Sequence, residues 1–206
     1  MKTRLAAAIG PEAAADLYRA LVEHVLETTA PRPGEYERLV FFDPPGALEE
    51  MRAWLPGVRL LAQSGGDLGA RMADAFARAF ARGARRVAIV GTDAPGVARE
   101  TVLEALSALD AADVALGPAE DGGYCLLALR EPRPELLSGI AWSTATVAAE
   151  TRSRAASAEL TVRELPALRD LDTLDDLRGL WPHLEGLLEG RPALREALRR
   201  HVDLLE

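Results

Sequence analysis

The chain has little of what marks several protein classes. It contains one cysteine, Cys125, so no disulfide can form within it. No uninterrupted apolar run approaches the ~20 residues that span a bilayer, and the first residues lack the apolar stretch of a secretory signal. We therefore expect a cytoplasmic protein in which Cys125, inside the apolar run YCLLAL, is a buried core residue and not a reactive thiol.

An excess of basic residues is also absent. The chain has 24 Lys and Arg against 32 Asp and Glu, which gives a net charge of -8. A broad nucleic-acid surface needs a basic patch, so we expect no nucleic-acid partner, although a few local basic residues can still bind a small anion. The three histidines have no cysteine or acidic residue at the spacing of zinc ligands, which argues against a zinc site.

What is present is enough apolar sequence for a full core. The chain has 206 residues, 49% of them hydrophobic, and no repeat or low-complexity linker, so we predict one domain over residues 1–206. Apolar runs typical of strands alternate with helical periodicity, and the chain is helical from about residue 173. The predicted strands are 39–42, 58–63, 86–93, 113–118 and 124–130. The predicted helices between and around them are 11–29, 46–55, 71–82 and 97–110.

The run RVAIVGTD, residues 86–93, is the clearest strand. It is apolar at successive positions, which is typical of a strand covered on both faces. Together with the alternation of strands and helices, it predicts a three-layer α/β/α sandwich with a mostly parallel central sheet. In such sheets ligands bind outside the carboxyl ends of the strands, so polar residues at those ends become candidates for the site.

Two aspartates follow predicted strands. Asp93 comes directly after IVGT, where its carboxylate can hold a metal ion or can cap the helix that starts near Pro95. The segment RDLDTLDDL ends a predicted strand with Asp170 and Asp172 and starts a helix at Thr173. Asp172 therefore offers a second carboxylate at a junction that is also an ordinary capping arrangement.

Two glycine-containing segments lie between predicted elements. In GPAEDGGY, Asp121 precedes Gly122 and Gly123. This pattern allows a ligand to approach the backbone closely, but it is also typical of a plain hairpin turn, and the residues alone favour the hairpin turn. In QSGGDLGARM, the glycine-rich loop at Gly65 and Gly66 follows a strand and precedes a helix. Main-chain N–H groups and the helix dipole receive anions at such places.

The order of these segments resembles a known superfamily. KTRL, Q..GGDLGARM..AF, VAIVGTDAP, GPAEDGGYCLLAL, AWSTATV and DLDTLDDL are similar to the nucleotide-diphospho-sugar transferases with the glycosyltransferase-A fold. More closely, the chain resembles bacterial glycosyltransferases of the arsenosugar-biosynthesis type, from Lys2 to about Leu180. It is more distantly similar to guanylyl- and cytidylyltransferases. The resemblance implies a nucleotide or nucleotide-sugar ligand, a small-molecule acceptor and Mg²⁺ or Mn²⁺.

The resemblance also implies roles for individual residues. Asp93 would be the first metal ligand and Asp172 the second, with Lys2 and Arg4 on the phosphates. The nucleotide would contact Gly65, Gly66 and Arg71. The sugar or acceptor would meet Asp121, Gly122 and Gly123, with Asp121 as the candidate general base. Trp142 would stack on a substrate ring or pack in the core, and packing is the favoured interpretation.

The start of the chain departs from the family pattern. Family members usually begin with a hydrophobic strand and a loop that ends in Pro-Gly-x-x before the matching Lys-Thr-Arg-Leu, and that strand lies centrally in the sheet. We expect the start to be either an internal Met of a longer chain, which is the favoured interpretation, or the result of a truncation. Without the strand, unpaired edges would make this chain marginally stable or self-associating, and a homodimer is one expected form.

Three functions follow as hypotheses. The first is a metal-dependent glycosyltransferase with a nucleotide-sugar donor. The second is a nucleotidyltransferase that joins a nucleoside triphosphate to a phosphorylated small acceptor and, unlike the first, releases pyrophosphate. The third is a nucleotide-binding or partner-binding protein without catalysis.

Overall fold

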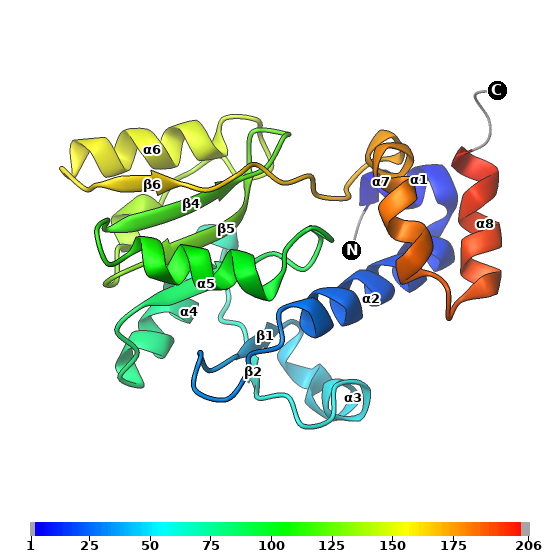
Figure 1. The fold of residues 1–206 in the computed structure, drawn as a ribbon, viewed down its shortest axis with the longest axis horizontal. Coiled ribbons are helices and arrows are strands. Elements are labelled where there is room, and N and C mark those ends of the chain that lie inside the picture. The colour runs from blue at the N-terminus through cyan, green and yellow to red at the C-terminus, as the bar shows by residue number, and fades with distance from the viewer. Residues whose placement is uncertain (1–2, 203–206) are drawn as a thin grey trace.

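Strands and helices alternate along most of the chain (Figure 1), as a computed structural model shows for residues 3–202. The first half contains α1 (Thr3–Ile9), α2 (Pro11–Thr28), β1 (Val40–Phe42), α3 (Leu48–Trp54), β2 (Leu60–Ala62), α4 (Leu68–Ala81) and β3 (Val87–Val90). The second half contains α5 (Arg99–Ala108), β4 (Val114–Pro118), β5 (Tyr124–Leu129), α6 (Val147–Ser157), β6 (Val162–Glu164), α7 (Leu174–Leu187) and α8 (Pro192–Val202). Short 3-10 turns cover Pro45–Ala47 and Pro134–Leu136.

The strands form two sheets. One has four strands in the order β3-β5-β4-β6, and the other is the parallel pair β1-β2. In the larger sheet β4 runs parallel to β6, whereas β5 is antiparallel to both β3 and β4. The reversal of β5 has a local cause: a short turn joins it to β4, and a short turn can connect only antiparallel neighbours. The interpretation of GPAEDGGY as a hairpin turn is therefore confirmed.

Helices cover both faces of the four-stranded sheet, which confirms the α/β sandwich. Side chains alternate along β4 and β5, so Val114, Leu116 and Leu127 face one side and Ala115 and Leu126 the other. The first side packs on α4 and α6, and the second packs on α5. Cys125 is buried, as expected.

Strand β3 is an edge of its sheet within residues 3–202. It pairs with β5 on one side, and no strand of this part of the chain pairs with its other side. Its four apolar residues, Val87–Val90, are consequently half-buried even though α4 and α5 both contact the strand. The sequence predicts a strand covered on both faces, and α4 and α5 provide that cover although the described residues supply only one paired strand.

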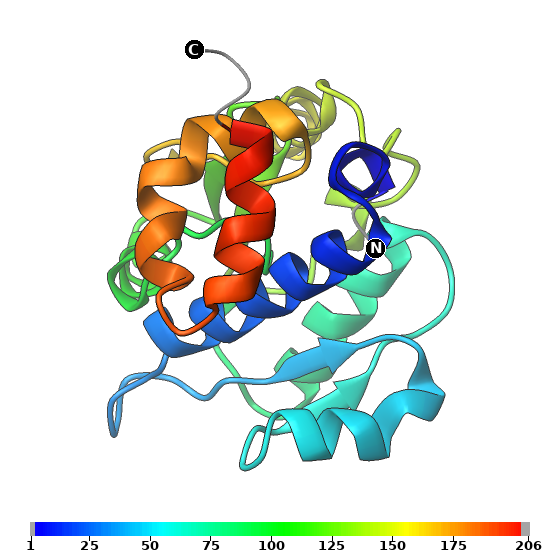
Figure 2. The ribbon, with the colours of Figure 1, turned by 90° about the vertical axis from the view of Figure 1, so that its right-hand side faces the viewer.

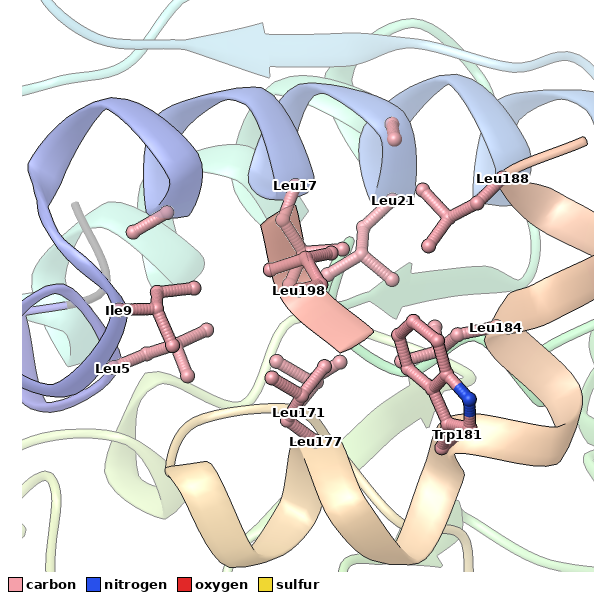
Figure 3. Packing of buried hydrophobic residues seen from close by; sticks show 12 residues of the cluster. Leu5, Ile9, Leu17, Leu21, Leu171, Leu177, Trp181, Leu184, Leu188 and Leu198 are labelled. Carbon is pink, nitrogen blue, oxygen red and sulfur yellow. The ribbon is translucent and has the colours of Figure 1, made fainter. Parts of the chain in front are cut away.

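A second apolar cluster joins the two ends of the described chain. The cluster contains residues of α1 and α2, the segment before α7, the last two helices and the residue that caps α7 (Figure 3): Leu5, Ile9, Leu17, Leu21, Leu171, Leu177, Trp181, Leu184, Leu188 and Leu198. Figure 2 shows α7 and α8 lying across α2. The helical pattern from about residue 173 is thereby confirmed. None of the helices in the described range has the length and apolarity needed to cross a membrane.

Some local predictions differ from the structure. The helix predicted to begin at residue 71 begins at Leu68, because the side chain of Asp67 accepts a hydrogen bond from the N–H of Ala70 and caps it. The prediction of a regular strand directly before Asp170 is wrong. Strand β6 ends at Glu164 and only an isolated bridge at Leu168 continues the pairing. Pro166 lies between them and has no N–H to donate to the ladder.

Candidate metal and nucleotide site

Asp93 lies just beyond the carboxyl end of β3. The N–H of Gly91 donates to the carbonyl of Cys125 at 2.8 Å, so the pairing with β5 continues past Val90 toward the aspartate. Ala94, next along the chain, is fully buried and fixes the loop. The helix that follows begins at Arg99 with Ala98 in the cap position, so Asp93 is not its cap. The capping alternative for Asp93 is wrong.

The segment that carries Asp170 and Asp172 is held against Asp93 by the residue between them. The N–H of Leu171 donates to the main-chain carbonyl of Asp93 at 2.9 Å, and its side chain is fully buried in the cluster of Figure 3. Successive side chains of an extended segment point to opposite sides. Burial of Leu171 therefore turns Asp170 and Asp172 away from the apolar cluster.

Helix α7 is capped without using the Asp172 side chain. The hydroxyl of Thr173 accepts from the N–H of Asp176, and the carboxylate of Asp176 accepts from the N–H of Thr173 at 2.8 Å and of Asp172 at 3.1 Å. This reciprocal arrangement satisfies the first N–H groups of the helix. The capping interpretation of the segment is confirmed for Thr173, and it leaves the Asp172 carboxylate for another partner.

Three carboxylates meet at this place. One oxygen from each of Asp93, Asp170 and Asp172 lies within 4.8 Å of the other two, and all three residues are half-buried. Carboxylates this close repel one another, and a cation between them relieves the repulsion. Hard oxygen ligands of this kind suit Mg²⁺ or Mn²⁺, so the residues fit the expected cation. The predicted pair Asp93 and Asp172 is brought together, and Asp170 joins them.

A cationic side chain also reaches the cluster. Nη2 of Arg4, on α1, lies 2.6 Å from Oδ2 of Asp172. The sequence predicts Arg4 near phosphates, and the structure places it beside the carboxylates that would hold the cation. Lys2, predicted to share that role, lies outside the described residues.

The glycine-rich loop is closed by Arg71. Its guanidinium donates to the carbonyl of Gly66 at 3.1 Å, to Gln63 Oε1 at 3.1 Å and to Asp43 Oδ2 at 3.2 Å. Asp43 follows β1 and Gln63 follows β2, so Arg71 connects the carboxyl ends of both parallel strands to the loop. Gly65 and Gly66 are thus held at the start of α4, and their contact with a nucleotide stays a prediction.

The residues of the hairpin turn between β4 and β5 make contacts that stabilise the turn. Gly122 has φ +92°, and a Cβ there would lie 2.1 Å from the carbonyl oxygen of Ala145. Its own carbonyl accepts from the N–H of Ala148 at 3.0 Å, near the start of α6. The carboxylate of Asp121 accepts from the N–H of Gly123 at 2.8 Å. The turn is therefore docked on the loop before α6, and the substrate-binding role of Asp121, Gly122 and Gly123 stays a prediction.

Trp142 packs against the first residues of β5 and of α4. Its ring meets that of Tyr124 edge-on at 6.3 Å between centroids, and it lies so close to Gly69 that a Cβ there would come within 2.9 Å of the indole. Burial raises the pKa of the Tyr124 hydroxyl, which keeps it neutral. These contacts match the packing interpretation of Trp142, and stacking on a substrate ring is untested.

Gly91 sets the position of the Asp93 side chain, and its replacement by alanine provides a test. A Cβ at Gly91 would lie 2.7 Å from Oδ1 of Asp93, so Gly91→Ala must rotate that carboxylate away. We expect the affinity for Mn²⁺ to fall by about 10-fold, as when a metal ligand loses its orientation. Isothermal titration with MnCl₂ measures it.

Gly46→Ala is the matched control, because a Cβ at Gly46 meets nothing within 4 Å. This variant should bind Mn²⁺ as the unaltered protein does. Equal affinity of Gly91→Ala and the unaltered protein would contradict the described position of the Asp93 carboxylate.

Comparisons with known proteins give the family of the chain and relatives of the same fold. The family DUF2064, described as an uncharacterized protein conserved in bacteria, matches residues 26–144, which is more than half of the chain. No curated protein matches. A solved structure from Desulfovibrio desulfuricans G20, provisionally assigned as a nucleotide-diphospho-sugar transferase, is 35% identical with a TM-score of 0.83, and covers 97% of this chain and 88% of that chain.

Two more distant structures share the fold. CMP:2-keto-3-deoxy-manno-octonic acid synthetase, complexed with CTP, is 15% identical with a TM-score of 0.56, over 81% of this chain and 88% of that one. Rv0371c from Mycobacterium tuberculosis H37Rv, complexed with manganese, is 21% identical with a TM-score of 0.50, over 79% and 84%. The chain therefore belongs to the bacterial DUF2064 family and has the fold of the nucleotide-diphospho-sugar transferases.

Proposed function

We propose that the protein is a transferase that binds a nucleotide sugar through a divalent cation held by Asp93, Asp170 and Asp172. The observation that carries the proposal is the meeting of these three carboxylates, within 4.8 Å, beyond the carboxyl end of β3. Ligands of open α/β sheets bind at such ends. The relative with 35% identity supports the nucleotide-sugar donor, and the arsenosugar-type subfamily remains an expectation from the resemblance.

The charge distribution suits the chemistry of group transfer. A nucleotide leaving group gains negative charge on its phosphates as the bond to the transferred group breaks, so the site needs positive charge fixed in advance. A bound Mg²⁺ or Mn²⁺ supplies that charge to the phosphate oxygens. The aspartates hold the cation, while Arg4, which contacts Asp172, can bind two phosphate oxygens at once through its guanidinium.

The remaining residues are proposed to bind the organic parts of the substrates. The loop at Gly65 and Gly66, braced by Arg71, offers main-chain N–H groups at the start of α4 to the nucleotide. The hairpin at Asp121, Gly122 and Gly123 faces the sugar or acceptor, and Asp121 is the candidate general base that accepts the acceptor's proton. Trp142 packs on Tyr124, which follows the hairpin, and on Gly69, which follows the glycine-rich loop.

A thermal-shift panel tests the proposal. Nucleoside diphosphates, nucleoside triphosphates and nucleotide sugars are each added with and without Mn²⁺ or Mg²⁺. Since ligands stabilise the native state by mass action, we expect a metal-dependent rise in Tm of several degrees for nucleotide sugars of one base. A response to triphosphates alone, with release of pyrophosphate on adding a phosphorylated acceptor, would establish the nucleotidyltransferase instead. No response to any nucleotide with either metal would refute the proposal.

A further inference from the structure

We propose that Arg4 exchanges partners during ligand binding: it neutralises Asp172 when no cation is bound, and it leaves Asp172 for the phosphates once a cation and a diphosphate enter. The inference rests on the proposed function, because it concerns the same aspartate cluster. It adds that one side chain opposes cation binding in the empty site and supports diphosphate binding in the loaded one.

The contact itself is direct and involves the cluster. Nη2 of Arg4 lies 2.6 Å from Oδ2 of Asp172, and Asp172 contributes an oxygen to the group that lies within 4.8 Å. A guanidinium in that position lowers the repulsion among the carboxylates. A divalent cation bound by the same carboxylates would repel the guanidinium and would take over its role.

The backbones on both sides of the contact are anchored, whereas the Arg4 side chain is not. Leu5, next to Arg4, and Leu171, next to Asp172, are nearly or fully buried in the same apolar cluster. The Arg4 side chain is 59% exposed and that of Asp172 is 29% exposed. A change of partner therefore needs only rotation of a long, solvated side chain about its own bonds, with α1 and α7 left in place.

The chemistry of arginine suits two anionic partners in turn. Its guanidinium is always charged and presents a planar fork of donors that fits a carboxylate or a phosphate. Without a nucleotide, the charge of Arg4 competes with the cation for the cluster. With a diphosphate bound to the cation, the guanidinium of Arg4 can pair with a phosphate oxygen. Arg4 then raises the affinity of the site for the diphosphate.

The test uses Arg4→Gln and two probes, Mn²⁺ alone and inorganic pyrophosphate at saturating Mn²⁺. Free Mn²⁺ is measured by electron paramagnetic resonance, and pyrophosphate binding by calorimetry. We expect Arg4→Gln to bind Mn²⁺ alone about 5-fold more tightly and pyrophosphate about 10-fold more weakly, within the range of ordinary coupling between sites. Arg4→Lys, which keeps the charge but lacks the fork, should bind Mn²⁺ nearly as the unaltered protein does and pyrophosphate more weakly.

Arg86→Gln is the matched control, because Arg86 pairs with Asp110 and precedes β3, at the strand end opposite to Asp93. It should leave both affinities unchanged. If Arg4→Gln weakens both probes, or leaves Mn²⁺ affinity unchanged, the exchange of partners is refuted while the metal site stands. If the unaltered protein binds no Mn²⁺, the metal site and the proposal built on it both fail.

Discussion

Asp93→Asn should lower Mn²⁺ affinity by about 100-fold or more, because it removes one ligand charge from a three-carboxylate cluster. Loss of the groups that merely orient a metal ligand costs about 10- to 100-fold, and loss of a ligand charge should exceed the lower part of that range. The amide has nearly the size of the carboxylate, so the fold should persist. The main-chain carbonyl that accepts from Leu171 is also retained. Calorimetry with MnCl₂, followed by the nucleotide panel, measures the effect.

The control removes the same charge elsewhere. Asp110 pairs with Arg86 beyond the opposite end of β3 and its side chain is 73% exposed, so Asp110→Asn should bind Mn²⁺ and nucleotides as the unaltered protein does. Unchanged Mn²⁺ affinity in Asp93→Asn would show that Asp93 is not a metal ligand. An equal loss in both variants would show a general effect of net charge.

Leu171→Ala should give the largest loss of stability. Leu171 is fully buried in the cluster that joins α1, α2, α7 and α8. Replacing a buried leucine by alanine costs about 3 kcal/mol through lost burial and the cavity left behind. For a chain of this size we expect Tm to fall by roughly 6–12 °C. Thermal unfolding followed by circular dichroism measures it.

The same substitution also tests the architecture of the site. Burial of Leu171 is what turns Asp170 and Asp172 toward Asp93. At temperatures below the melting transition, the affinity for Mn²⁺ should therefore be lower than that of the unaltered protein, even though no metal ligand has been changed. Leu68→Ala is the control for stability, since Leu68 is 50% exposed and the same truncation there should cost little. A Tm loss equal to that of Leu68→Ala would contradict the described burial of Leu171.

Asp93 was accessible to sequence reasoning because its strand is a continuous apolar run and a polar residue at the end of such a run is conspicuous. Asp170 was visible beside Asp172, and residues two apart in an extended segment face the same side, yet the sequence could not show that both reach Asp93. That approach depends on a main-chain hydrogen bond between Leu171 and Asp93. The ion pair between Arg4 and Asp172 likewise joins residues 168 positions apart.

Helix α6 was not predicted, and strand β6 ends earlier in the chain than the strand predicted before Asp170. The buried residues of α6 are Val147, Ala148, Thr151 and Ala155, all small or β-branched, so the helix shows little of the large-residue periodicity by which helices are recognised. Strand β6 is three residues long and mostly exposed. The reversal of β5 was implicit in the hairpin interpretation of GPAEDGGY, which conflicts with an all-parallel alternation of strands and helices.

The contact of Leu171 with α1 and α2 has a consequence for the order in which the molecule matures. The aspartate cluster combines a residue from the middle of the chain with two from its last fifth, and the cation-facing arginine comes from its first turn of helix. During synthesis the sheet and its helices can pack before residues 170–172 emerge from the ribosome. The cluster can form only afterwards, when the last helices close over the first ones, so we expect the proposed cation to bind only to chains that have completed their folding.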